Sequence, residues 1–355
     1  VLLPELPAGD AVRGVELLVP GGGRVDWSVQ GDFLAYDRAG SDGLYDIYKS
    51  SADGAGRVCL TCPLLEFQNA NATNPSWHPS GRLLVFQVQQ RARQIEQTLL
   101  ERSTPERGLH TELWTITADG RSFFQLTRPE QSGPSLLDPC FSHEGKLLAW
   151  SERATDRGGL WGEWILRVGR FDERAGVPRL SHVRTYRPGG GRSFVEIDGF
   201  TADDRGLILS GNLEPGQPES GMDLYRFDLE TEQLTRLTRT LGDFDDAGHV
   251  SPAGDRLAWA SGRDVPPLLR GPGRDAGRPF PTDLWLMNLD GSGAQRLTIF
   301  NPDAGRDPSF AAAVTDLAWN PDGDRIAATV VRDFGAPRED IFLVELDPNF
   351  GRRPH

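Results

Sequence analysis

The sequence predicts a six-bladed β-propeller of four-stranded antiparallel blades, with the ring closed by the N-terminal strand. Three observations lead to this prediction. A tight turn recurs after the first strand of each repeat, in its fullest form, with both Pro and Gly, at residues 319–323. An acidic residue followed by two apolar residues opens each third strand, as at residues 283–285. An unpaired strand at residues 12–19 precedes the first repeat, while the last repeat lacks a fourth strand.

The six repeats follow one plan: an extended segment, a tight turn, an apolar strand, a third strand and a short fourth strand. Pro and Gly supply the turn dihedrals, and β-branched and aromatic residues fill the runs between the turns. The third strands begin at Asp46, Glu112, Glu163, Asp223, Asp283 and Asp340. Because an acidic residue stands there in every repeat, we expect these side chains to be structural and to accept hydrogen bonds from neighbouring backbone or hydroxyl groups.

Five repeats end in a pair that marks the fourth strand. These pairs are Leu60-Thr61, Leu126-Thr127, Leu180-Ser181, Leu237-Thr238 and Leu297-Thr298. The sixth repeat stops after its third strand, where an unpaired edge would be a liability. Residues 12–19 are therefore expected to pair there as the fourth strand of the last blade. The expected organisation is an extension at 1–11, one propeller at 12–346 and a tail at 347–355.

Composition narrows the classes of function. The 355 residues include 51 acidic and 38 basic side chains, a formal net charge of −13. This charge argues against nucleic-acid binding, which needs a basic patch, and favours cation binding. No run approaches the ~18 apolar residues of a membrane span, so we expect no membrane-spanning segment. The chain starts at Val1 without a leader, as either a processed export signal or a shortened sequence would leave it, and we expect a periplasmic or extracellular protein.

The turn, third-strand and Leu-Thr patterns resemble the repeat of the TolB-like (PD40, WD40-like) six-bladed propeller family over residues 12–346. The resemblance implies the fold, but such blades occur in periplasmic binding proteins, in propellers attached to serine peptidases and in some polysaccharide lyases. The chain lacks the Gly-x-Ser-x-Gly nucleophile elbow of the peptidases. It also lacks the histidine cluster that the lyases use to hold a metal.

Long segments are expected on one face of the ring. In a propeller, the loops between second and third strands emerge beside the connections between blades. The long segments are 89–111, 152–162, 211–222, 261–282 and 332–339, with blade connections at 63–73, 187–193 and 299–311. Binding loops vary in length in this way, so we predict that this face binds a protein or other ligand. The alternative is that surface loops tolerate insertions at little cost.

The insert at 89–111 carries a short apolar stripe at helical spacing, which includes Ile95 and Leu99. A helix there would cap the ring mouth, dock a partner or pack onto its own domain. The insert at 261–282 is rich in Pro, Gly and Arg, which indicates an extended loop.

Polar residues near the starts of the innermost strands form the candidate binding site. They are Asn74, Asp138, Asp198, Asp245, Asp246, His249 and Asp316. We expect them near the loop-rich mouth of the channel, where oxygen ligands suit calcium better than zinc. The candidate metal ligands are Asp138, Asp246 and Asp316. The alternative is a hydrated channel in which these side chains cap strands and turns.

The sequence favours a non-catalytic, exported propeller that binds a protein or other ligand, as a scaffold or as an accessory subunit of a larger surface or membrane assembly. The alternative is a metal-dependent hydrolase or lyase at the channel mouth, with His249 as base and Asp245 or Asp246 orienting it. Cys59 and Cys62 have redox or metal spacing, and we interpret them as small residues at a strand end. A bridge from either to Cys140 is an open alternative.

Overall fold

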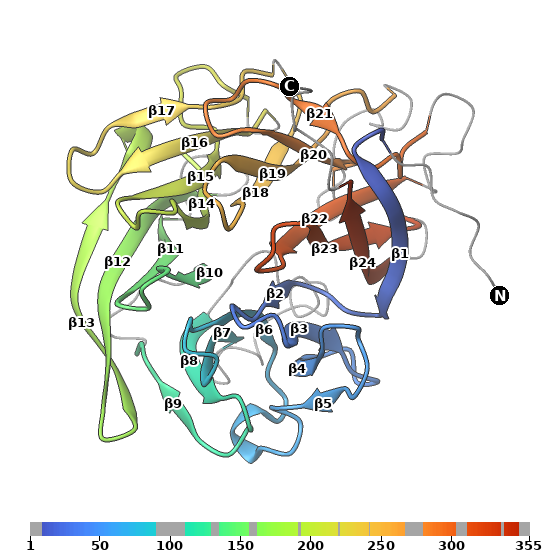
Figure 1. Cartoon of the computed structure of the whole chain (residues 1–355). Coiled ribbons are helices and arrows are strands. Elements are labelled where there is room, and N and C mark those ends of the chain that lie inside the picture. The colour runs from blue at the N-terminus through green and yellow to red at the C-terminus, as the bar shows by residue number, and fades with distance from the viewer. Residues whose placement is uncertain are drawn as a thin grey trace.

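The computed structural model describes residues 9–89, 111–128, 135–155, 162–190, 193–218, 221–240, 242–266, 280–302, 311–334 and 337–347. They form six four-stranded sheets set around a common centre (Figure 1). Every pairing between neighbouring strands within these sheets is antiparallel. The predicted six-bladed propeller is confirmed. Within the described residues, no helix has the length and apolar character needed to cross a membrane.

The first three blades follow the chain from the inner strand outward. Blade one has β2 (Val25–Trp27), β3 (Phe33–Ala39), β4 (Tyr45–Ser51) and β5 (Val58–Cys59). Blade two has β6 (Ala72–Trp77), β7 (Leu83–Gln89), β8 (Thr111–Thr117) and β9 (Phe123–Gln125). Blade three has β10 (Leu136–Phe141), β11 (Leu147–Thr155), β12 (Glu163–Arg174) and β13 (Val177–Tyr186).

Blades four and five repeat the plan, and blade six differs by taking its outer strand from the N-terminal end. Blade four has β14 (Val195–Phe200), β15 (Gly206–Gly211), β16 (Asp223–Asp228) and β17 (Leu234–Arg236). Blade five has β18 (Asp245–Val250), β19 (Arg256–Ser261), β20 (Asp283–Asn288) and β21 (Gln295–Arg296). Blade six has β22 (Ala312–Trp319), β23 (Arg325–Arg332), β24 (Arg338–Leu346) and β1 (Val12–Pro20). Short 3₁₀ turns lie at η1 (Leu65–Phe67) and η4 (Pro188–Gly190).

Closure of the ring rests on β1. It pairs antiparallel with β24 from Val12 opposite Leu346 to Pro20 opposite Asp340. In Figure 1 the blue β1 accordingly lies along the dark red β24. Without β1, the edge of β24 would present unpaired backbone groups to solvent. The two ends of the propeller are therefore joined within one sheet.

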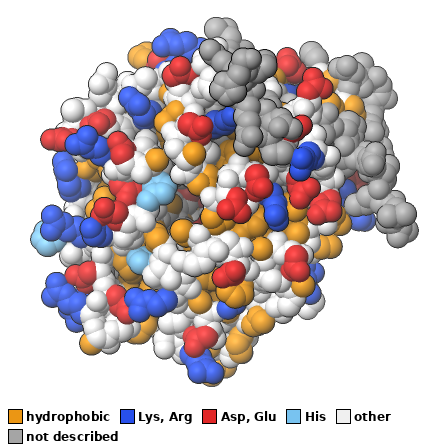
Figure 2. All heavy atoms as spheres, viewed as in Figure 1, with side chains coloured by type: hydrophobic (Ala, Val, Ile, Leu, Met, Phe, Trp, Pro, Cys, Tyr) orange, Lys and Arg blue, Asp and Glu red, His pale blue; other side chains and the backbone are white. Residues whose placement is uncertain are grey.

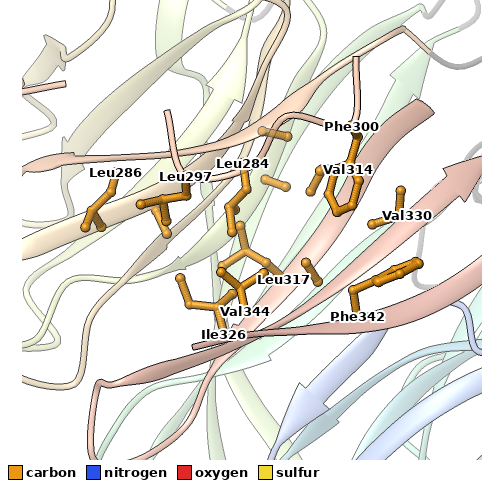
Figure 3. Close-up of a cluster of buried hydrophobic side chains, with 14 of the residues drawn as sticks. Leu284, Leu286, Leu297, Phe300, Val314, Leu317, Ile326, Val330, Phe342 and Val344 are labelled. Atoms are coloured by element: carbon orange, nitrogen blue, oxygen red, sulfur yellow. The ribbon is translucent and has the colours of Figure 1, made fainter. Parts of the chain in front are cut away.

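The core is distributed between blades, because each sheet buries its faces against its neighbours. At the junction of blades five and six, Leu284 and Leu297 pack in one cluster with Leu317, Val344 and Phe342 (Figure 3). All five side chains are buried. Similar clusters join the other blades, so each repeat depends on the next for burial of its apolar surface.

The third-strand acid and the Leu-Thr ending prove to be two parts of one local structure. In blade five, Thr298 Oγ1 accepts a hydrogen bond from the Leu284 backbone N–H at 2.9 Å and donates one to Asp283 Oδ1 at 3.2 Å. The same bridge joins Thr61 to Asp46 and Ile47 in blade one, and Thr238 to Asp223 and Leu224 in blade four. The hydroxyl thereby ties the short fourth strand to the start of the third.

Blade three departs from this plan. The prediction that Leu180-Ser181 ends its fourth strand is wrong, because Ser181 lies opposite Arg170, well along the hairpin from Glu163. The strands β12 and β13 continue instead into a long hairpin, which Figure 1 shows on the outer rim. Near its tip, Phe171 packs on His78 with ring centroids 5.4 Å apart. The hairpin therefore contacts blade two.

The cysteine pairing differs from the interpretation made from sequence. Cys59 and Cys62 form a disulfide at the outer edge of blade one. Cys140 is free and lies on the inner strand β10, so neither of its proposed bridges forms. The long segments at 89–111 and 261–282 lie largely outside the described residues, and with them the stripe of Ile95 and Leu99.

Candidate functional site: the central cavity

The inner strands of blades two to six share a break in their pairing. The register with the second strand shifts between Thr73 and Ser76, Leu137 and Cys140, Ile197 and Gly199, Asp246 and His249, and Val314 and Asp316. At three of these bulges a non-glycine residue has positive φ, namely Asn74, Asp138 and Ala247. A bulge bends its strand and turns a side chain to a new direction. Here the bulges lie at residues that face the ring centre.

These inner strands enclose a cavity of about 240 Å³, and the space-filling view is hollowed near the centre of the ring (Figure 2). Its lining has two zones. We call the first the acidic waist, formed by Asp138, Glu196, Asp198, Asp246 and Asp316. We call the second the aromatic collar, formed by Trp27, Trp77, Phe141 and Phe200. Each collar residue is the last residue of its inner strand, so the collar adjoins the turns to the second strands.

The position of this cavity differs from the expectation for the channel residues. They were expected at the loop-rich mouth, but the cavity runs from the waist to the short turns, where Val29, Pro79 and His143 line it. These turns lie at the opposite ends of the inner strands from the connections between blades. The strands begin before Asp138, Asp198 and Asp316, so these side chains lie within the strands rather than at their first residues.

The hydrogen bonds of the waist hold several of its carboxylates in place. Asp138 Oδ1 accepts from Asn74 Nδ2 at 2.6 Å and lies 3.4 Å from Arg24 Nη1. Asp198 Oδ2 accepts from the Ser210 hydroxyl at 2.7 Å. Asp316 accepts from two backbone N–H groups, those of Val25 and Leu317, each at 2.9 Å. The Asn74–Asp138 and Val25–Asp316 bonds connect neighbouring blades, Arg24 reaches from blade one to blade three, and the Ser210 and Leu317 bonds lie within a single blade.

Acidic side chains are concentrated in the waist. Protein surrounds these side chains, and burial raises the pKa values of Glu196, Asp198, Asp246 and Asp316. The pKa of Asp246 is raised to about 6 by burial. Burial and repulsion by Asp246 raise the pKa values of Glu196 and Asp198 well above their usual range. Among the described lining residues, Arg24 is the only arginine or lysine.

Two oxygen atoms at the waist have no hydrogen-bond partner among the described residues. They are Asn74 Oδ1 and Asp246 Oδ1, and both atoms are buried. Asn74 as a whole is 5% exposed, although it lines the cavity. A buried acceptor without a donor costs about 1–3 kcal/mol, so such atoms are rare unless a water or a ligand satisfies them.

His249 and Asp245 do not form the pair considered from sequence. Asp245 is fully buried in blade five, where it accepts hydrogen bonds from Trp259 Nε1 at 3.1 Å and from the Ser261 hydroxyl. The carboxylate nearest His249 in the cavity belongs to Asp316, with Nε2 and Oδ1 3.7 Å apart. Burial, with a smaller effect of Arg24, lowers the pKa of His249 to about 4, so the ring is neutral at pH 7.

The three predicted calcium ligands are spread around the waist. A metal site of this kind needs at least three acidic, histidine or cysteine side chains with their ligand atoms within 4.8 Å of one another. Among the described residues, this condition is met by Asp46, Cys59 and Cys62. The set of Asp138, Asp246 and Asp316 does not meet this condition. Calcium at the waist stays a prediction.

Sequence reasoning missed two charged residues of the site, Arg24 and Glu196, and the four residues of the aromatic collar. Arg24 precedes Val25-Asp26-Trp27 as Asn74 precedes Pro75-Ser76-Trp77, so alignment of the repeats on the last residue of the inner strand would have found it. Glu196 precedes Asp198 by two positions, the spacing of side chains on one face of a strand. Both line the cavity.

The architecture and this cavity define a closed six-bladed propeller with a polar central channel. No family model matches the chain, and no curated protein sequence matches it. Among solved structures, the chain is similar to TolB from Acinetobacter baumannii, at 13% identity and a TM-score of 0.50. The match covers 92% of this chain and 64% of that one, so the chain spans less than two thirds of that TolB.

A putative TolB from Agrobacterium tumefaciens is also similar, at 15% identity and a TM-score of 0.54, over 96% of this chain and 100% of that one. An oligogalacturonate lyase from Vibrio parahaemolyticus matches at 12% identity and a TM-score of 0.48, over 97% of each chain, which is too distant to bear on function. The chain therefore has the fold of the TolB propeller, as the sequence resemblance implied.

Proposed function

We propose that this chain is a non-catalytic binding propeller that recognises its ligand or partner protein in the central cavity. The observation that carries the proposal is the pair of buried, unpartnered oxygens, Asn74 Oδ1 and Asp246 Oδ1, which belong to two residues that line the cavity. A folded protein rarely leaves such atoms unsatisfied, so their presence supports a binding role for the cavity.

An exported location belongs to the same proposal. The Cys59–Cys62 disulfide supports it, because disulfides persist in oxidising compartments such as the periplasm or the cell exterior. A role as accessory subunit of a larger surface or membrane assembly, through the loop-rich face, rests on segments that lie largely outside the described residues.

The test is capture of partners from the native host with three versions of the chain. The wild type is compared with the double variant Glu196→Gln, Asp246→Asn, which keeps side-chain size and removes two carboxylates from the waist. A matched control is Asp119→Asn, which removes an exposed carboxylate from a turn of blade two. Loss of specific partners with the waist variant but not with Asp119→Asn is expected. Equal capture by all three would contradict a binding role of the cavity.

A metal-dependent hydrolase or lyase is the second candidate, and the neutral His249 beside Asp316 is the observation that favours it. A general base needs an available lone pair, which a neutral imidazole offers. The discriminating variant is His249→Ala, assayed for partner capture and for turnover of polysaccharides and peptides. Intact capture together with loss of a measurable turnover would replace the binding proposal by the enzymatic one.

A further inference from the structure

We propose that the central cavity binds an organic cation, an alkyl-ammonium or guanidinium group on an apolar stem. The charged head group lies in the acidic waist and the stem lies along the aromatic collar. The inference rests on the proposed binding function and names the chemistry of its ligand. Two sources share this chemistry, a free amine and a lysine or arginine side chain of a partner.

The first argument is the balance of charge in the cavity. Five carboxylates form the waist, while Arg24 is the only arginine or lysine among the described lining residues. Arg24 already interacts with Asp138, at 3.4 Å. Carboxylates gathered in a low-dielectric cavity repel one another, and a cation between them relieves this repulsion.

The second argument is the geometry of the unsatisfied acceptors. Asn74 Oδ1 is buried without a partner among the described residues, while the same side chain donates from Nδ2 to Asp138. Asp246 Oδ1, on the inner strand of blade five, is also buried without a hydrogen-bond partner among the described residues. An ammonium group carries three N–H donors and a guanidinium group five, so one head group offers donors to several acceptors at once.

The third argument separates an organic cation from a metal ion. Calcium requires six to eight oxygen ligands at about 2.3–2.6 Å from a single point. Among the described residues, the waist provides no group of three acidic or histidine side chains with ligand atoms within 4.8 Å of one another. Dispersed acceptors suit a head group whose N–H bonds point in several directions.

The fourth argument is the collar. The residues Trp27, Trp77, Phe141 and Phe200 line the cavity at the turn-side ends of their inner strands, and their side chains also pack in the clusters between blades. An alkyl stem that leaves the waist toward the turns would lie against the parts of these residues that face the cavity. Aromatic faces also attract ammonium and guanidinium groups, by about 0.5–2 kcal/mol. The two zones therefore match the two parts of the ligand.

The experiment is isothermal titration calorimetry on the full chain with defined probes. The cationic probes are n-butylammonium, N-acetyl-lysine amide and N-acetyl-arginine amide, and the neutral control is N-acetyl-norleucine amide. We expect the cationic probes to bind and the neutral one not to bind. Preference for the amino-acid amides would assign the ligand to a partner side chain, and preference for butylammonium would assign it to a free amine.

Some variants should weaken binding of the probe and one should strengthen it, and this contrast shows whether the probe binds at the waist. Asp246→Asn and Glu196→Gln should each weaken binding of the best probe at least tenfold. Arg24→Gln should strengthen it, because the cation that competes for Asp138 is removed. Asp119→Asn should leave it unchanged. Thermal melting of each variant confirms that it is folded, so weaker binding is not mistaken for unfolding.

Three results would overturn the inference: equal binding of the neutral probe, unchanged affinity in both carboxylate variants, or calcium that binds at the waist and excludes the ammonium probes. Failure of the inference is distinguishable from failure of the proposed function. If no cationic probe binds but partner capture still depends on Glu196 and Asp246, only the ligand chemistry is wrong. If capture is also indifferent to both residues, the binding role of the cavity fails with it.

Discussion

Several buried carboxylates of this protein have pKa values that burial raises, among them those of Asp26, Asp37 and Asp246. Asp37 illustrates their effect, since it is 1% exposed and accepts hydrogen bonds from the backbone N–H groups of Arg24 and Asn74. Burial, with repulsion by Glu339, raises its pKa to about 8. The folded protein therefore holds a proton on Asp37 more tightly than the unfolded chain, whose carboxyl has a pKa near 3.8.

The stability of the protein should fall as the pH is raised from about 4 to about 8. The folded-state pKa of Asp37 lies above the unfolded value, so its favourable contribution is complete at low pH and is lost as the pH rises through this interval. Asp37→Asn should flatten this part of the pH profile, by a change on the order of a few kcal/mol between its ends. Urea unfolding at a series of pH values measures it.

Asp119→Asn is the control for this prediction, because the Thr117 hydroxyl lowers the pKa of the exposed Asp119. Its stabilising effect is present above the unfolded pKa and is lost only as the pH falls below it. The slope between about pH 4 and about pH 8 should not change in this variant. A wild-type profile that rises over this interval would contradict the role assigned to the buried carboxylates.

At the scale of the strand, the threonine bridge explains why two sequence patterns recur together. Thr298→Val removes the hydroxyl but keeps the shape, and leaves the Leu284 N–H without its acceptor. We expect a loss of about 1–3 kcal/mol in the free energy of unfolding. The matched control is Thr235→Val on β17, where the side chain is exposed. Equal effects of the two substitutions in urea unfolding would show that the bridge contributes nothing.

The disulfide belongs to the same scale, because it links the end of the two-residue strand β5 to the turn that follows. Alkylation in denaturant without reductant should label Cys140 alone, and all three cysteines after reduction. In the folded protein Cys140 should react slowly, since burial raises the pKa of its thiol. Labelling of Cys59 or Cys62 before reduction would contradict the assigned pairing.

At the scale of the whole molecule, closure of the ring through β1 is the contact on which cooperative stability depends. A chain that lacks residues 1–20 loses the partner of β24, which leaves an exposed strand edge and uncovers part of the cluster around Phe342. We expect a lower melting temperature, a broader transition and aggregation through the open edge.

A chain that lacks only residues 1–8 is the control for this deletion, because β1 begins at Val12. Its melting curve should match that of the full chain. If the longer deletion also melts like the full chain, the ring does not depend on β1 for closure. Differential scanning calorimetry compares the three proteins.

Calcium is also a question for the whole ring, since its candidate ligands come from blades three, five and six. Thermal melting with calcium or with EDTA distinguishes a calcium ion at the waist from the proposed organic cation. A large upward shift with calcium would support the ion predicted from sequence, and no shift would leave the organic cation as the ligand that fits the waist.

The sequence predicted much of the fold because each blade repeats its local chemistry. Turn residues, alternating apolar positions and the acid at the third strand recur in register, and the missing fourth strand after Leu346 indicated the closing role of β1. Blade three was misread at Ser181, because the pattern of a Leu-Ser pair does not reveal how far a hairpin extends. A local sequence pattern therefore predicts which residues form a strand better than it predicts how long that strand is.

The candidate site was determined by sequence only in its composition. The inner strands supplied Asn74, Asp138, Asp246 and Asp316 as expected, but their direction depends on bulges, which are a property of the pairing of two strands. Tertiary structure alone decided that Asp245 is buried in its own blade, that Asp316 faces His249, and that the cavity runs toward the short turns. Repetition along the chain encodes a blade, whereas the chemistry of the channel arises where six different blades meet.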